Sequence, residues 1–247
     1  MGAAGAIRER PLQTGHPYVD KNCLSLASSG YYFMLNIKDL SRPELPTQDN
    51  YDQALKMGLE IFGRKDPGRV AQKAGALFEG RSVIVSHLDR EIVLNVDTQR
   101  LSIKETDEEA PIWLAILTLH YLNNADGRQP TGRLKHFREF KDGHFYEPAF
   151  NRRTKEILVQ VFGTDPAPMI AAARKLKGKD VETGDAAVEL PYYPCLPITC
   201  IVWKGDDEFP PEATVLFDET ADLFFSAEDM AVAGQMAVLE LLKAARG

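Results

Sequence analysis

A series of carboxylates near the C-terminus is the clearest candidate for chemistry in this chain. Asp206, Asp207 and Glu208 follow one apolar run, and Asp218 ends the next. If the two runs pair as a hairpin, these side chains gather, and they would then hold a hard divalent cation or supply a general acid and base. Charged loops between strands are also ordinary solvated turns. The pattern leaves a metal-dependent enzyme open beside a structural loop.

Histidines with aromatic and basic neighbours form a second candidate set. His120 lies beside Tyr121 in the most apolar segment of the chain, where a histidine is either a core residue or an axial ligand for a tetrapyrrole metal. His136 and His144 lie in more polar segments and could serve equally well. Arg138 adds a guanidinium that pairs with carboxylate or phosphate. The sequence leaves the cofactor unknown, and the candidate for this set is a tetrapyrrole, either a corrinoid or haem.

The cysteines do not form a recognisable metal motif. Four residues separate Cys195 from Cys200, which is wider than the C-x2-C spacing of structural zinc sites, and Cys23 is the remaining thiol. We therefore expect free thiols that pack in the interior. An odd number of cysteines in a chain of this length indicates a reducing compartment, with the cytoplasm as the default.

Composition excludes several partners. The 29 basic and 36 acidic residues give a net charge of −7, which disfavours binding to nucleic-acid phosphates. No apolar run is long enough to cross a membrane, and the N-terminus lacks the apolar core of a secretory signal, so we expect a soluble protein. The common phosphate-loop, dinucleotide, serine-hydrolase and zinc-protease motifs are missing from the sequence.

Hydrophobic periodicity predicts the elements that would position these residues. Helices are expected at 51–62, 67–78, 108–124, 148–162 and 167–176, and a last helix is expected to begin with a capping box formed by Ser226 and Asp229. Strands are expected at 31–37, 134–140, 187–192, 198–203 and 214–217, with a small antiparallel meander over 82–103.

This order of elements favours an α+β fold with a mixed or mainly antiparallel sheet packed against helices. The segment 108–124 is apolar on most sides and should be a central helix. We expect an N-terminal arm at 1–30 and a single domain at 31–247, with a possible subdivision near residue 180.

Three ordered blocks carry a family resemblance. Leu117 to Gly127, Gly132 to Phe140 and, above all, Leu196 to Met230, which contains WKGDDEFPPEATVLFD, resemble the uncharacterised family DUF3786 of anaerobic bacteria and archaea. Some relatives in this family carry a four-cysteine iron–sulfur module like that of corrinoid proteins. The resemblance implies a setting of low-potential redox or corrinoid metabolism. Because Cys23 is the only early cysteine, no iron–sulfur cluster is expected from this chain alone.

Two hypotheses about function therefore remain open. In the first, the chain is a non-catalytic accessory protein that engages a tetrapyrrole, or a redox or corrinoid protein partner through the acidic loop and the Arg138–Glu139 region. In the second, it is an enzyme that uses a metal ion held by the acidic cluster at 206–219. The sequence does not decide whether the protein is an enzyme, and it leaves the oligomeric state open.

Overall fold

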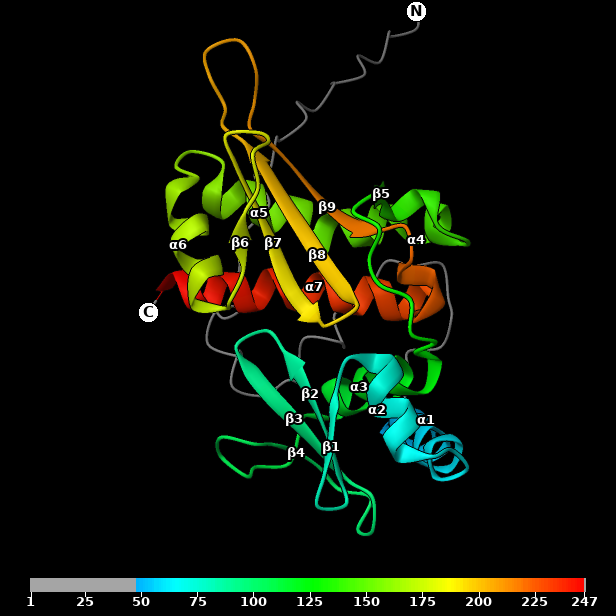
Figure 1. Ribbon diagram of the computed structural model, residues 1–247. Coiled ribbons are helices and arrows are strands. Elements are labelled where there is room, and N and C mark those ends of the chain that lie inside the picture. The colour runs from blue at the N-terminus through cyan, green and yellow to red at the C-terminus, as the bar shows by residue number, and fades with distance from the viewer. Residues whose placement is uncertain (1–47, 247) are drawn as a thin grey trace, which may run out of the picture. The chain divides into compact units, whose positions relative to one another are not determined.

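The computed structural model describes residues 48–246 (Figure 1). The expected arm at 1–30, the expected strand at 31–37 and Cys23 lie outside the described residues.

Alternating apolar residues build the first sheet, whose strands follow one another in the order β1-β2-β3-β4 and are all antiparallel. Val83, Val85, Ile92 and Leu94 are fully buried on one of its faces, which confirms the predicted meander. The strands are β1 Leu77–Glu79, β2 Ser82–His87, β3 Arg90–Asn95 and β4 Leu101–Ile103.

The helix predicted at 67–78 is shorter in the structure, because its last residues form strand β1 instead. Helix α2, Pro67–Ala74, ends where Gly75 adopts a left-handed conformation with φ of 64°. The Gly75 N–H caps the last carbonyls of the helix, which is the usual role of a glycine just past a helix end. The residues beyond it are therefore free to pair with β2.

Two further helices pack with this sheet. Helix α1, Gln48–Gly63, has a glycine at the point where Leu119 packs against it. A Cβ at Gly58 would lie 3.1 Å from the Leu119 side chain, so glycine allows this close packing. Helix α3, Ile112–Asn124, is buried on nearly all sides, and the Asn123 amide donates to the Gly58 carbonyl over 2.9 Å.

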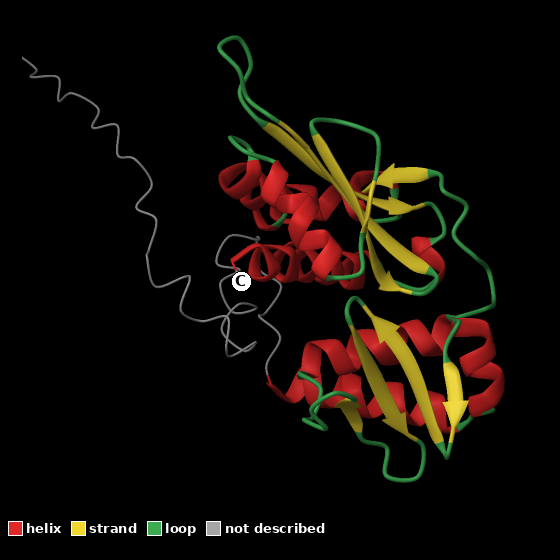
Figure 2. Cartoon of the chain, turned by 60° about the vertical axis from the view of Figure 1, so that its left-hand side comes forward, coloured by secondary structure: helices red, strands yellow, loops and turns green. Residues whose placement is uncertain are grey.

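The second sheet has the order β5-β9-β8-β7-β6 and is also antiparallel throughout. Figures 1 and 2 show helices packed against one face of it. Its strands are β5 Leu134–His136, β6 Lys179–Asp180, β7 Ala186–Tyr193, β8 Leu196–Trp203 and β9 Glu212–Asp218, and the helices are α4 Gly143–Arg153, α5 Lys155–Phe162, α6 Ala167–Lys175 and α7 Ala227–Arg246.

The single helix expected at 148–162 is in fact two helices. Helix α4 begins earlier, at Gly143, where a side chain is impossible because a Cβ would lie 2.0 Å from the Phe137 carbonyl oxygen. The helix breaks at Thr154, whose backbone (φ −127°, ψ −77°) leaves helical geometry and whose hydroxyl donates to the Phe150 carbonyl. Helix α5 starts directly after this break.

The turn between β2 and β3 contacts a β-bulge in β7. Leu190 pairs with Ile198 and Tyr193 with Leu196, so Pro191 and Tyr192 lie opposite the single residue Pro197. The Leu88 N–H donates to the Pro191 carbonyl at 3.1 Å, and Nδ1 of His87 lies 3.0 Å from the Tyr192 carbonyl oxygen.

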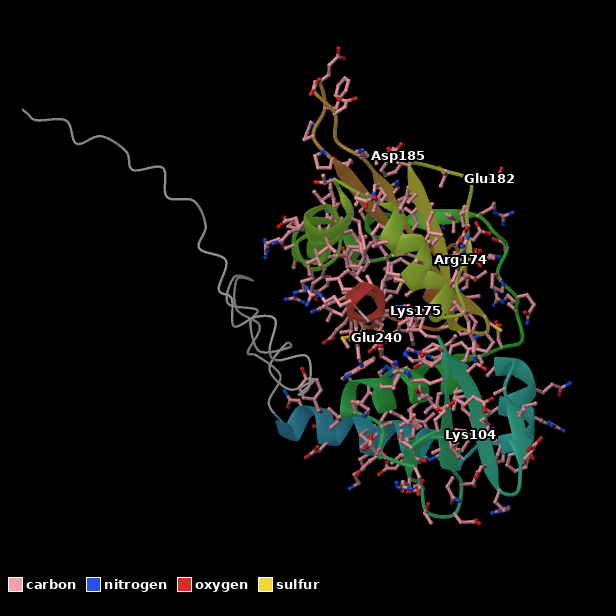
Figure 3. The ribbon with its side chains drawn as sticks, turned by 90° about the vertical axis from the view of Figure 1, so that its left-hand side faces the viewer. Lys104, Arg174, Lys175, Glu182, Asp185 and Glu240 are labelled. Atoms are coloured by element: carbon pink, nitrogen blue, oxygen red, sulfur yellow. The ribbon has the colours of Figure 1, made fainter. Side chains whose placement is uncertain are left out.

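An ion pair strengthens the same contact. Glu240 projects from α7 toward the first sheet (Figure 3) and accepts a 2.8 Å hydrogen bond from Arg90. Both side chains are largely buried. The fold is α+β with two antiparallel sheets, and the described residues belong to one compact unit that contains both.

Helix α7 provides a test of this packing. A Cβ at Gly234 would lie 2.7 Å from Cε2 of Phe150, a buried ring that stacks on Phe137. We expect Gly234→Ala to destabilise the protein by about 1–3 kcal/mol through overpacking, although alanine favours helix more than glycine does. Denaturant unfolding measures the change.

The matched control is Gly63→Ala in α1, where the nearest neighbour of a Cβ is the Gln99 side chain at 3.8 Å. This variant should be neutral or more stable. Equal stability changes in the two variants would contradict the packing of α7 described above.

Candidate ligand-binding site

A histidine–aspartate pair joins α3 to the start of α7. Nδ1 of His120 lies 2.9 Å from Oδ1 of Asp229. The other oxygen of Asp229 accepts hydrogen bonds from the backbone N–H and the hydroxyl of Ser226, at 3.1 and 2.9 Å. The Asp229 N–H donates back to the Ser226 hydroxyl, which confirms the predicted capping box. The carboxylate that faces His120 is thus held by the helix start.

The pair favours a charged imidazole. The hydrogen bond to Asp229 raises the pKa of His120 above its ordinary value of 6.5, against the lowering effect of partial burial, and the charge of Glu228 adds to the rise. The His120 side chain is 34% exposed, and between residues 48 and 246 its Nε2 atom has no hydrogen-bond partner. The protonated ring can transfer a proton, and once Nε2 has lost its proton the oriented imidazole can bind a metal centre through that nitrogen.

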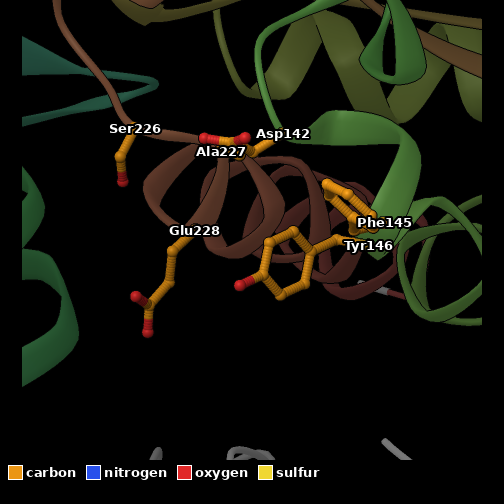
Figure 4. Close-up of a pocket in the computed structure, with 6 residues that line it drawn as sticks. All are labelled: Asp142, Phe145, Tyr146, Ser226, Ala227 and Glu228. Carbon is orange, nitrogen blue, oxygen red and sulfur yellow. The ribbon is translucent and has the colours of Figure 1, made fainter.

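A hollow of about 360 Å³ lies at the start of α7 (Figure 4). Glu228 and Ser226, which flank it, come from the same helix start that holds Asp229. The six described residues that line the hollow include no Lys, Arg or His, and they are Asp142, Phe145, Tyr146, Ser226, Ala227 and Glu228.

The lining is acidic and aromatic. In the described part of the chain, neither the Asp142 nor the Glu228 carboxylate forms an ion pair. The rings of Phe145 and Tyr146 are 68% and 41% exposed, which leaves apolar surface for a ligand. The arrangement suits a ligand with positive charge and apolar surface.

Tyr121, the neighbour of His120 in the sequence, lies in the core instead. Its hydroxyl donates to the Ala74 carbonyl at 2.6 Å and accepts from the Cys195 N–H at 3.0 Å. Its ring stacks on Tyr193 and Phe224. The structure therefore gives Tyr121 a structural role and does not bring it to the hollow.

The other members of the histidine set lie at the surface. Nδ1 of His136, in β5, is 3.3 Å from the Thr214 hydroxyl, while the His144 ring packs on Phe145 with centroids 3.8 Å apart. Arg138 is exposed, with Nε 3.8 Å from Glu147. His144 does not line the hollow, although the adjacent Phe145 does.

The expectation that a hairpin gathers the carboxylates is wrong. Strands β8 and β9 do pair, but Trp203 faces Glu212 next to the loop, and Ile198 faces Phe217 at the far end of β9. Six strand residues, 212–217, therefore separate Asp218 from the loop that holds Asp206, Asp207 and Glu208, a distance of about 20 Å.

Each end of this acidic set has a local structural role. Asp218 is buried and accepts hydrogen bonds from the Gly132 N–H and from the N–H and hydroxyl of Thr220, contacts that hold its pKa below the ordinary value despite burial. Asp206 accepts from the N–H groups of Glu208 and Phe209. Within residues 48–246, no group of three or more His, Cys, Asp or Glu side chains is placed to hold a metal ion.

Two other sequence predictions can be compared with the described residues. Cys195 and Cys200 are buried free thiols, as expected, and burial raises the pKa of Cys200 to about 12. None of the helices between residues 48 and 246 has the length and apolar character needed to cross a membrane.

Sequence reasoning missed most of the site. It identified Ser226 and Asp229 only as a helix cap, and it did not select Asp142 or Glu228 as binding residues. The capping box was the one available signal, because it fixes a carboxylate at a helix start. No local sequence pattern indicates that Asp229 contacts His120, which lies 109 residues away in the chain.

The pair makes a testable prediction about protonation. Asp229→Asn should lower the pKa of His120, because the amide cannot supply the charge that stabilises the imidazolium. An NMR titration of the His120 ring measures this pKa. Asp142→Asn, which changes a carboxylate of the hollow that does not contact His120, is the control and should leave the value nearly unchanged.

The same pair sets the direction of a stability change with pH. Because the pKa of His120 is raised by folding, the contribution of the pair is complete below the unfolded-state pKa and is lost as pH rises through the folded-state pKa. The Tm difference between wild type and Asp229→Asn should therefore narrow as pH rises through that range. A constant difference would assign the effect of Asp229 to the Ser226 cap alone.

Comparison with known proteins places the chain in a family. No curated protein and no solved structure matches it. The family model described as "Domain of unknown function (DUF3786)" matches residues 66–240, a span that runs from the residue before α2 to near the end of α7 and contains both sheets. The match covers His120, Asp229 and every residue that lines the hollow. Since this span exceeds half of the sequence, the chain belongs to the DUF3786 family.

Proposed function

We propose that this protein is a non-catalytic accessory protein of anaerobic redox metabolism that binds a metal-centred tetrapyrrole through Nε2 of His120. The observation that carries the proposal is the 2.9 Å contact between His120 Nδ1 and Asp229. A histidine that binds a metal commonly donates a hydrogen bond from its other ring nitrogen to a carboxylate. This hydrogen bond fixes the orientation of the ring and makes the metal-binding nitrogen a better ligand.

The lining of the hollow favours a corrinoid over haem. Haem carries propionate carboxylates, which the neighbouring Asp142 and Glu228 would repel, whereas the side chains of a corrinoid are largely neutral amides. The exposed rings of Phe145 and Tyr146 offer apolar contact to the edge of a macrocycle. At about 360 Å³ the hollow is at the small end of ligand pockets, so it would receive one edge of the ligand and leave the rest uncovered.

A second candidate function is docking of a redox or corrinoid protein partner on the β8–β9 loop, and the observation that favours it is the 67% exposure of Phe209. The base of the loop is tightly packed, because a Cβ at Gly163 or Gly205 would lie within 2.7 Å of Pro211. An exposed aromatic side chain on a rigid loop can anchor a partner protein, because the loop loses little conformational entropy when the partner binds. Once a partner is isolated, Phe209→Ser should weaken its binding at least tenfold, and an unchanged Kd would exclude the loop.

The remaining hypothesis, a metal-dependent enzyme that uses the acidic cluster, has less structural support. Its carboxylates lie at opposite ends of β9, and those of Asp206 and Asp218 already accept hydrogen bonds from neighbouring residues.

Absorption spectroscopy tests the tetrapyrrole proposal directly. Titration with hydroxocobalamin should give a saturable spectral change, because an imidazole replaces water at cobalt. His120→Ala should abolish the change, and Asp229→Asn should weaken binding about 10–100-fold through loss of the supporting carboxylate.

His136→Ala is the matched control and should bind like wild type, since His136 lies in β5 and does not line the hollow. A change that survives in His120→Ala, or no change at all, would reject binding at His120. A His120-dependent change with haemin and none with hydroxocobalamin would keep the site and overturn the preference for a corrinoid.

A further inference from the structure

The hollow at the start of α7 keeps a net negative charge. Asp142 and Glu228 both line it, and the six described lining residues include no basic side chain. Each carboxylate lies at a helix start, Asp142 just before α4 and Glu228 in the first turn of α7. The two helix starts supply roughly half a positive charge each, so about one unit of negative charge remains among these groups. This charge favours a cation as the ligand.

Two aromatic rings form the apolar part of the same hollow. Phe145 and Tyr146 lie near the start of α4 and are both exposed, although phenylalanine is among the residues most often buried. The His144 ring packs on Phe145 with centroids 3.8 Å apart and supports that ring. Figure 4 shows the Tyr146 ring and the Glu228 side chain extending in the same direction, with the Tyr146 hydroxyl turned toward Glu228. Ring surface and carboxylate oxygens thus face one space.

The backbone that carries these groups is fixed on both sides of the hollow. Asp142 has a φ of 64°, which is uncommon for a residue other than glycine, and Gly143 after it packs so closely on the Phe137 carbonyl that no side chain fits there. Across the hollow, Ser226 and Asp229 form the capping box of α7. A ligand would therefore bind to a preorganised backbone, which reduces the entropy lost on binding.

The lining favours an organic cation over a metal ion. A hard metal ion needs several oxygen ligands around one point, and between residues 48 and 246 no group of three or more His, Cys, Asp or Glu side chains provides them. A guanidinium uses both parts of the lining, because it stacks on aromatic faces and donates paired hydrogen bonds to a carboxylate. At about 360 Å³ the hollow suits one small group of this kind.

We propose that this hollow binds a guanidinium group, with its face on the exposed aromatic rings and its N–H groups directed to the carboxylates of Asp142 and Glu228. The group belongs to a small guanidinium compound or to an arginine side chain of a partner protein, since both present the same chemistry. The site does not use His120, so it holds or fails independently of the tetrapyrrole proposal.

An NMR titration of the protein with methylguanidinium chloride tests the proposal. Saturable shifts are expected in the signals of Phe145, Tyr146 and Glu228, whereas N-methylurea, which is neutral and of similar shape, should give none. Glu228→Gln and Phe145→Leu should each weaken binding about two- to fivefold, because an exposed ion pair or cation–π contact contributes roughly that factor. Both side chains are exposed, so these variants should keep the fold, as an unchanged circular dichroism spectrum would verify.

Asp222→Asn is the matched control, because it removes an exposed carboxylate that precedes α7 and does not line the hollow. It should bind like wild type. Equal weakening in Asp222→Asn and Glu228→Gln would assign the shifts to general attraction by an acidic protein and would overturn the proposal. Absence of saturable shifts, or equal shifts with N-methylurea, would also overturn it.

A second probe distinguishes the two sources of the guanidinium. The tripeptide Gly-Arg-Gly with blocked ends carries the same group on a short piece of backbone. Tighter binding of this peptide than of methylguanidinium would support an arginine of a partner protein, and equal or weaker binding would support a free guanidinium compound.

Discussion

The contact between the β2–β3 turn and the bulge of β7 is the constraint on which the remaining structure depends. Pro191 and Tyr192 lie opposite Pro197, which has no N–H to offer, so their carbonyls need donors from outside the sheet. Leu88 and His87 provide these donors. Two sheets with separate hydrogen-bond ladders thereby become neighbours, and the ion pair between Arg90 and Glu240 brings α7 into the same contact.

Helix α3 transmits this arrangement to the candidate site. The Tyr121 hydroxyl bridges the end of α2 and the β7–β8 turn, which fixes the rotation of α3 about its axis. Successive residues of a helix are about 100° apart around that axis, so with Tyr121 in the core, His120 faces the start of α7. The rotation that buries Tyr121 therefore turns His120 toward Asp229. This explains why one of these adjacent residues is structural and the other belongs to the candidate site.

The candidate site combines a rigid polar group with a more open surface. The capping box orients the Asp229 carboxylate, which in turn orients the His120 ring and favours its protonated form, while the hollow at the start of α7 presents unpaired carboxylates and exposed aromatic rings. Family membership extends over both parts, because the matched span includes both sheets and the whole lining of the hollow.

The sequence by itself determined the fold class and most of the elements, but not where every helix ends. Period-two alternation predicted the meander at 82–103, near-continuous apolar character predicted α3, and the spacing of Ser226 and Asp229 predicted a capping box, because these signals depend on neighbours within a few residues. Residues in the N-terminal arm lie outside the described range. Tertiary structure alone decided which carboxylates meet a histidine: the register of β9 keeps Asp218 away from Asp206, and the packing of α3 on α7 brings His120 to Asp229. Such meetings join residues far apart in the chain, and they arise from sheet register and helix rotation, which no local pattern encodes.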